Sequence, residues 1–205
     1  MKIAIIGYGK IGGTLGTKWA VDRHTVQFGV RDPNKPDVQR LVRSLGKNAS
    51  ASGVAEAIGA AGVVVFAIPG SAMQQTVSDH ARALEGKIVV DTTNNFGGGA
   101  PVANSLAVFQ SKVPSVKYYR AFNIYGWENF EDPVYGGVTG DLFYCGPEGE
   151  AKSQVEELIS DVGLRPVYLG GPDQAGVVDG ALRLWAALVM GQKMGRTLAF
   201  KVLTR

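Results

Sequence analysis

Three glycines near the start of the chain have a spacing that suggests chemistry. They follow the apolar run 2–6 directly, in a G-x-G-x-x-G pattern made of Gly7, Tyr8, Gly9, Lys10, Ile11 and Gly12. Between a strand and a helix, the first glycine of this pattern permits a tight turn and the second lets the backbone approach a pyrophosphate. The third lets the helix pack close to the strand, and the helix N-terminus offers free N–H groups. A glycine-rich turn without function is the alternative in a chain with 28 glycines, but the position after a strand favours dinucleotide binding.

The end of the second apolar run, residues 25–30, indicates which dinucleotide is bound. NAD-preferring domains normally carry Asp or Glu there, on the ribose hydroxyls. Here Val30 and Arg31 occupy the position, and Lys35 follows four residues later. Guanidinium and ammonium groups bind phosphate, so the pattern favours NADP over NAD. Asp32 is an acid next to this position, and we expect it to turn away as the start of an Asp-Pro turn.

The elements that must hold these residues alternate regularly. Five strand-like runs, the fourth of them a uniformly apolar segment over residues 62–68, are separated by helical segments, which is typical of a doubly wound parallel sheet. Further strands are expected at 116–121, 142–146 and 164–169. The prediction is an α/β, Rossmann-type doubly wound parallel sheet with extra C-terminal strands and a helix. We expect a single domain over residues 1–205, with a dinucleotide-binding core at 1–122. Residues 123–205 then hold an acceptor loop, the last strands and the C-terminal helix.

Two loops follow strand ends and could contact a ligand. Residues 92–101 are polar and glycine-rich, and ligands of open α/β sheets bind at such carboxyl ends. Residues 124–140 contain four aromatic residues: Tyr125, Trp127, Phe130 and Tyr135. These could line a pocket for a planar ligand or pack the loop onto the core, and the sequence leaves both open.

The last segment, from Asp173 to the end, is expected to form one or two helices. Apolar residues surround most of the helix that begins there, so it should be buried in the core or form a homodimer contact.

The composition limits the partners. A net charge of +3 with scattered basic residues argues against nucleic acid. The single Cys145 excludes an internal disulfide, and the distant His24 and His80 make no metal site without several carboxylates. The chain enters a strand at once, which leaves no room for a signal peptide, and its longest apolar stretch is too short to span a membrane. We therefore expect a cytoplasmic protein that neither associates with a membrane nor binds a metal.

These residues resemble the coenzyme F-420-dependent NADP oxidoreductases, NADPH-dependent reductases related to the oxidoreductase domain of six-transmembrane metalloreductases. The matching segments occur in the family's order over about 140 residues, and they are 5–12, 29–33, 68–69, 91–94, 120–123 and 144–146. The chain departs from the family at two positions. Val30 stands where the family has a serine on the 2′-phosphate, and Asn94-Asn95 replaces an Asn-Pro pair.

The resemblance implies where the reaction takes place. Nicotinamide is expected beside Ile68, Pro69, Thr92, Thr93 and Asn94. A small planar acceptor, either coenzyme F-420 or a flavin (FMN or FAD), would stack on it. Asn94, Asn123 and Trp127 are the residues expected to position the hydride transfer, with Tyr125 beside them. The cofactor carries the chemistry and the acceptor delocalises the charge, so no general acid is required.

Two alternatives stay open. One is an NADPH-dependent reductase of a small carbonyl or imine, for which only Tyr125, Tyr119 or Tyr144 could donate the proton. The other is a non-catalytic sensor that binds NADP. A β-hydroxyacid dehydrogenase is disfavoured, because Lys193 has no asparagine four residues later.

Overall fold

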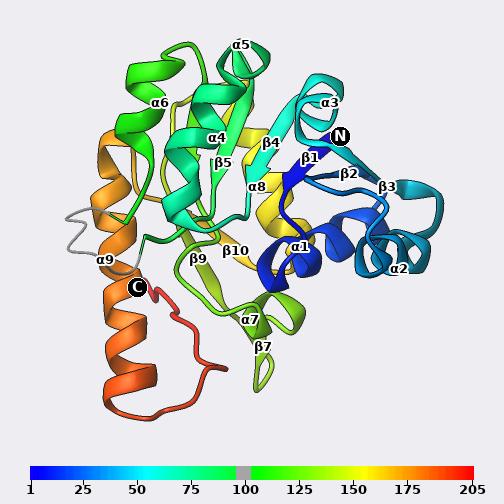
Figure 1. The fold of residues 1–205 in the computed structure, drawn as a ribbon. Helices are drawn as coiled ribbons and strands as arrows, with labels where there is room; N and C mark the ends of the chain where they lie inside the picture. The colour runs from blue at the N-terminus through cyan, green and yellow to red at the C-terminus, as the bar shows by residue number, and fades with distance from the viewer. Residues whose placement is uncertain (96–102) are drawn as a thin grey trace.

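Six parallel strands form the central sheet of this computed structural model, which describes residues 1–95 and 103–205. The strand order is β3-β2-β1-β4-β5-β6, and Figure 1 labels the first five of these strands. The strands are β1 Lys2–Ile6, β2 Thr25–Val30, β3 Ala49–Gly53, β4 Val63–Phe66, β5 Ile88–Asp91 and β6 Lys117–Arg120. The order reverses between β1 and β4, and such a switch point is where ligands of open α/β sheets bind. The Rossmann-type fold class expected from the sequence is confirmed.

Helices pack in two groups around this sheet (Figure 1). The first group contains α1 (Lys10–Val21), which contacts α2 (Pro36–Leu45) and α8 (Glu150–Val162). In the second group α3 contacts α5, and α4 contacts α6; these helices are α3 Val54–Ala60, α4 Met73–Asp79, α5 Ala81–Leu84 and α6 Leu106–Lys112. Short 3₁₀ turns occupy Gly46–Asn48, Gly70–Ala72 and Pro172–Gln174.

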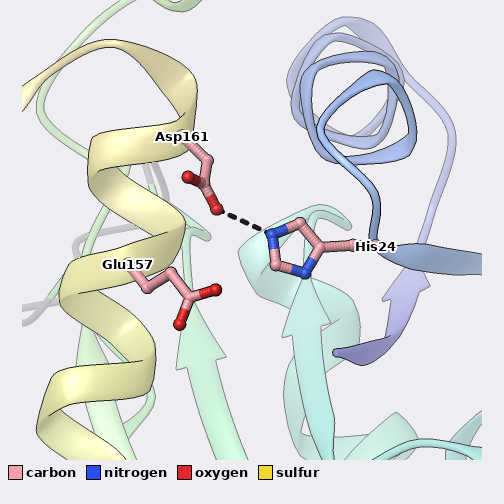
Figure 2. Close-up of side chains that lie close together, drawn as sticks. All are labelled: His24, Glu157 and Asp161. Carbon is pink, nitrogen blue, oxygen red and sulfur yellow. Dashed lines mark hydrogen bonds and ion pairs between the residues drawn. The ribbon is translucent and has the colours of Figure 1, made fainter.

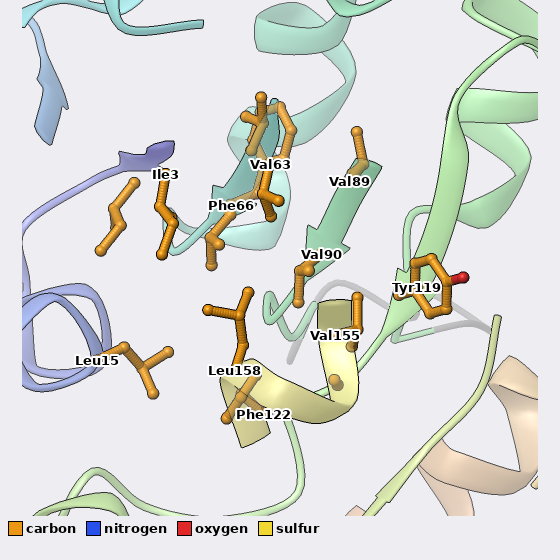
Figure 3. Packing of buried hydrophobic residues seen from close by; sticks show 14 of the residues in the cluster. Ile3, Leu15, Val63, Phe66, Val89, Val90, Tyr119, Phe122, Val155 and Leu158 are labelled. Atoms are coloured by element: carbon orange, nitrogen blue, oxygen red, sulfur yellow. The ribbon is translucent and has the colours of Figure 1, made fainter. Parts of the chain in front are cut away.

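The core lies between the sheet and these helices. Leu15 from α1, Leu158 from α8 and the strand residue Phe66 are fully buried members of this core (Figure 3). Since a strand covered on both faces has no polar side, β4 reads as an uninterrupted apolar run.

The C-terminal part builds its own small sheets. Strands β9 (Asp141–Tyr144) and β10 (Arg165–Tyr168) pair with each other in parallel, and β7 (Val134–Tyr135) pairs with β8 (Val138–Thr139). The short helix α7 (Glu128–Glu131) precedes that hairpin. An isolated bridge between Arg120 and Cys145 joins the β9 region to the end of β6.

The end of the chain corrects one expectation. Helix α9 spans Ala175–Ala186 and continues as a π-helix over Ala187–Gly191, but residues 192–205 are not helical. Lys193 and Gly195 have positive φ angles of 56° and 87°, which ends the helix. The segment returns to the core, where the Trp185 indole donates to the carbonyl of Leu198 at 2.8 Å.

No helix in the described ranges is both long and apolar enough to cross a bilayer. Of the glycine-rich loop predicted at 92–101, residues 96–101 lie outside the described part of the chain.

Candidate functional site

The glycine-rich turn has the backbone geometry that its pattern predicts. Gly7 has a φ of +106°, and a Cβ there would lie 2.5 Å from the carbonyl oxygen of Ala67. A Cβ on Gly12 would lie 2.4 Å from the carbonyl oxygen of Gly7, whereas a Cβ on Gly9 would meet nothing within 4 Å. The first and third glycines of the pattern are therefore required by the fold itself. The open space at Gly9 leaves room for a ligand against the backbone at the start of α1.

A cleft of about 570 Å³ opens beside this turn, at the carboxyl ends of β1, β2 and β4. Seven of the predicted residues line it: Gly7, Tyr8, Gly9, Val30, Arg31, Ile68 and Pro69. The sequence did not indicate Val54, Ser71, Ala72 and Thr76, which also line it. Val54 and Thr76 were missed because they come from helices that follow β3 and β4, and no local pattern shows that these helices face the cleft.

The two charged residues that follow β2, Arg31 and Asp32, have different surroundings. Arg31 is exposed and lines the cleft. The Asp32 carboxylate instead accepts the backbone N–H of Asn34 at 3.0 Å, inside its own turn. The Lys35 ammonium lies 5.8 Å from the centre of the Tyr8 ring, and a hydrogen bond to Tyr8 raises the pKa of Lys35. Of these three charged residues, Arg31 lines the cleft, whereas Asp32 and Lys35 do not.

Two other predicted residues lie on a second cleft, of about 720 Å³, that shares only Tyr8 and Gly9 with the first. The Lys10 ammonium lies 4.5 Å from the centre of the Trp127 ring, and both side chains line this second cleft. Asn94 and Asn123, which were expected to position the hydride together with Trp127, line neither of the two described clefts. Ile11 is partly buried against the core.

The polar residues after β5 are held by the protein itself. The Thr92 hydroxyl donates to the carbonyl of Phe66 at 2.8 Å, and the Thr93 hydroxyl donates to Asp91 at 2.6 Å. Neither threonine lines the described cleft. Asn94 is half-buried, and its amide donates to the carbonyl of Asn123 at 2.8 Å. The structure thus joins Asn94 to Asn123, two of the three residues expected to position the hydride.

A buried ionic network, which the sequence did not reveal, supports these asparagines. Arg120 is fully buried and lies opposite Asp91 in the β5–β6 register. Its guanidinium donates to the Asp179 carboxylate at 2.9 and 2.7 Å and to Asn94 Oδ1 at 2.8 Å. Burial lowers the pKa of Arg120, but Asp91 and Asp179 outweigh this effect and raise it. The only sequence signal was a charged residue at the end of each of two buried strands.

Asn123 belongs to this network through one end of its side-chain amide. The residue is 1% exposed, and Nδ2 donates to Asp179 Oδ1 at 3.2 Å. Its Oδ1 is the one buried side-chain oxygen or nitrogen of the described residues that has no hydrogen-bond partner. The preceding residue, Phe122, has a φ of 59°, which is rare for a bulky side chain. Strain and an unpaired acceptor together are characteristic of a functional position.

Comparison with known proteins agrees with this geometry. Residues 2–95 match the family described as NADP oxidoreductase coenzyme F420-dependent. The matched residues make up the nucleotide-binding part of the chain. The resemblance found in the sequence is confirmed, and the enzyme class is an NADP-dependent oxidoreductase.

Solved structures extend the similarity beyond residue 95. A proposed F420-dependent NADP reductase from Arthrobacter sp. FB24 superposes with a TM-score of 0.86 at 26% identity, and the match covers 100% of both chains. A hypothetical protein from Sinorhizobium meliloti gives 0.72 at 26% identity, over 100% of this chain and 96% of the other. A reductive aminase from Aspergillus terreus gives 0.67 at 19% identity, over 91% of this chain and 60% of that one, which shows a shared fold.

The three tyrosines considered as proton donors, Tyr119, Tyr125 and Tyr144, do not line either described cleft. Tyr125 was expected beside the acceptor, but it is buried, donates to the carbonyl of Asp141 at 2.7 Å and accepts the Phe200 N–H at 2.9 Å. Tyr119 donates to the carbonyl of Pro147 at 2.6 Å, and Tyr144 donates to Glu156. Burial raises the pKa of all three hydroxyls. For Tyr125, packing onto the core is therefore the correct alternative, and none of the three is placed as a proton donor.

Proposed function

We propose that this protein transfers a hydride between NADPH and a planar acceptor, either the deazaflavin coenzyme F-420 or a flavin. The observation that carries the proposal is at the end of β2. Arg31 lies in the cleft while Asp32 is bound within its own turn. A guanidinium at this place pairs with a 2′-phosphate, and an acid that would bind the two ribose hydroxyls of NAD is missing from the cleft lining.

The residues present fit NADPH. The open backbone at Gly9 and the start of α1 would bind the pyrophosphate. Arg31, with Lys35 behind it, would bind the 2′-phosphate, and Ile68 and Pro69 would pack against nicotinamide. When bound, the cofactor supplies a hydride from its nicotinamide ring.

The two asparagines at the carboxyl ends of β5 and β6 have the positioning role in this proposal. Asn94 is fixed by Arg120 and by the carbonyl of Asn123. Such double fixation leaves a side chain with little freedom, which is what orientation of a reacting group requires. Tyr119, Tyr125 and Tyr144 donate their hydroxyls elsewhere in the fold, and a delocalised acceptor does not require a proton from any of them. This supports a planar acceptor over a simple ketone.

The experiment is a set of NADPH oxidation assays with four acceptors: a deazaflavin, FMN, a small ketone and a preformed imine. Turnover with the deazaflavin or FMN is expected. Turnover with only the ketone or imine would favour a carbonyl or imine reductase. Tight NADPH binding without any turnover would favour a sensor.

The asparagine role has a separate test. Asn94→Ala should lower kcat by about tenfold or more while the KM for NADPH changes little, because positioning acts on the reacting complex. Asn48→Ala is the matched control. Asn48 is distant from Asn94 in the sequence, and its side-chain amide donates to the carbonyl of Ala20. Equal kcat in Asn94→Ala and the unaltered protein would remove Asn94 from the mechanism.

A further inference from the structure

A second group of polar side chains lies at the opposite end of β2 from the cleft. His24 immediately precedes this strand, whereas Arg31 immediately follows it. Six residues separate the two ends, which is about 20 Å at ~3.3 Å per residue. This group is therefore independent of the nucleotide site.

Three potential metal ligands meet here. One ligand atom from each of His24, Glu157 and Asp161 lies within 4.8 Å of the others. His24 Nε2 and Asp161 Oδ2 are 2.7 Å apart. Figure 2 shows Glu157 and Asp161 on successive turns of α8, with both carboxylates turned toward the imidazole. The sequence excluded a metal site unless several carboxylates joined a histidine, and the packing of α8 supplies them.

The elements that carry these ligands are fixed to each other. The Trp19 indole, near the end of α1, donates to the carbonyl of Leu158 at 2.9 Å in the buried interior. The backbone N–H of His24 donates to the carbonyl of Trp19 at 3.0 Å. Leu158 lies between the two acidic residues in the sequence, so one buried hydrogen bond sets the distance between the histidine and the acidic face of α8. Preorganisation of this kind is what a metal site requires.

A histidine–aspartate bridge alone leaves part of the cluster unexplained. His24 is 2% exposed, and its Nδ1 faces the amino group of Met1 at 2.9 Å, so Nε2 is the nitrogen directed at the acids. The Glu157 carboxylate has no hydrogen bond or ion pair with any described residue. The Asp22 carboxyl group is also within hydrogen-bonding reach of Asp161. Three carboxyl groups therefore gather around one imidazole and one amino group.

We propose that His24, Glu157 and Asp161 bind a divalent zinc ion, which links the turn before β2 to α8. One imidazole nitrogen with two carboxylate oxygens suits Zn²⁺ better than Mg²⁺ or Ca²⁺, which prefer oxygen ligands throughout. Zinc ligands lie at ~2.0–2.2 Å from the ion, so small side-chain rotations bring the three atoms into place. Binding displaces the Nε2 proton, and a water molecule takes the fourth position.

The test is calorimetric titration of ZnCl₂ into metal-free protein. One zinc ion per chain is expected. Glu157→Gln should weaken binding by at least about tenfold, since it removes one ligand, and the fold should be retained because Glu157 is exposed. Glu56→Gln is the matched control, an exposed glutamate on α3, and it should bind zinc like the unaltered protein.

Three results would overturn the proposal. They are no zinc binding, equal affinity in Glu157→Gln and the unaltered protein, and full affinity in a folded His24→Gln variant. Zinc should also raise the melting temperature of the unaltered protein, and of Glu157→Gln much less. NADPH affinity should be the same with and without zinc because the two sites lie at opposite ends of β2. A failed zinc titration therefore leaves the proposed function untouched. Failure of the acceptor assays likewise leaves the zinc proposal untouched.

Discussion

The guanidinium of Arg120 donates two hydrogen bonds to one carboxylate oxygen of Asp179, at 2.9 and 2.7 Å. Arg120 ends β6 and Asp179 lies in the middle of α9, so this pair joins the central sheet to the C-terminal helix. Both residues are buried. The same guanidinium contacts Asn94, which connects the proposed hydride-positioning residue to a helix 85 residues further along the chain.

Arg120→Met should lower the free energy of unfolding by about 3–5 kcal/mol, because it leaves the buried carboxylates of Asp91 and Asp179 without their cation. Urea denaturation measures this. Arg43→Met, an exposed arginine on α2, should change stability by less than about 0.5 kcal/mol. A loss below about 1 kcal/mol for Arg120→Met would mean that the network contributes little.

Arg31→Ala should weaken NADPH binding by about 10- to 100-fold and leave NADH binding nearly unchanged, because a charged hydrogen bond to phosphate contributes about 1.5–3 kcal/mol. Fluorescence titration with each nucleotide measures the two affinities. Arg43→Ala serves as the control, since Arg43 lines neither cleft. Equal losses for the two nucleotides would show that Arg31 does not bind the 2′-phosphate.

Cys145 should resist alkylation in the folded protein. It is fully buried, and burial raises the pKa of its thiol to about 12, so the reactive thiolate is scarce at neutral pH. Iodoacetamide labelling followed by mass spectrometry should show slow modification in buffer and complete modification in urea. Rapid labelling of the native protein would contradict the buried position.

Stability should fall at alkaline pH. The pKa values of Cys145, Tyr119, Tyr125 and Tyr144 are raised in the fold by burial. The unfolded chain releases these protons first, near pH ~8.5 for cysteine and near pH ~10 for tyrosine, so each group's contribution is full below that pH and declines as the pH rises toward its folded value. Melting temperatures between about pH 7 and 10.5 should therefore decrease, and Cys145→Ala should lose the part that begins near pH ~8.5. A constant melting temperature over this pH range would contradict the raised pKa values of these four groups.

A homodimer through the C-terminal helix stays a prediction. Val177, Leu184 and Met190 are 57%, 53% and 70% exposed on α9 and its π-helical continuation. If these apolar side chains meet a second copy of the chain, Leu184→Glu should convert a dimer to a monomer in analytical ultracentrifugation. Lys112→Glu is a charge-change control at the end of α6. A monomeric unaltered protein would show that this face is free in solution.

The nucleotide-binding half follows from short stretches of sequence. The glycine pattern, the apolar strands and the Arg31 position are local features, and their meaning depends on residues within about one βαβ unit. A positive φ at Gly7 and the close approach at Gly12 come from the same short pattern. For this reason the fold class and the resemblance to the family could both be predicted from the order of residues along the chain.

Contacts between distant side chains depend instead on how the whole chain packs. Trp127 was grouped with Asn94 and Asn123 by the resemblance, but packing places it on Lys10. The Arg120 network and the cluster at His24 each join segments more than fifty residues apart. No local periodicity encodes such contacts, because they are set by the way α8 and α9 pack onto the rest of the fold.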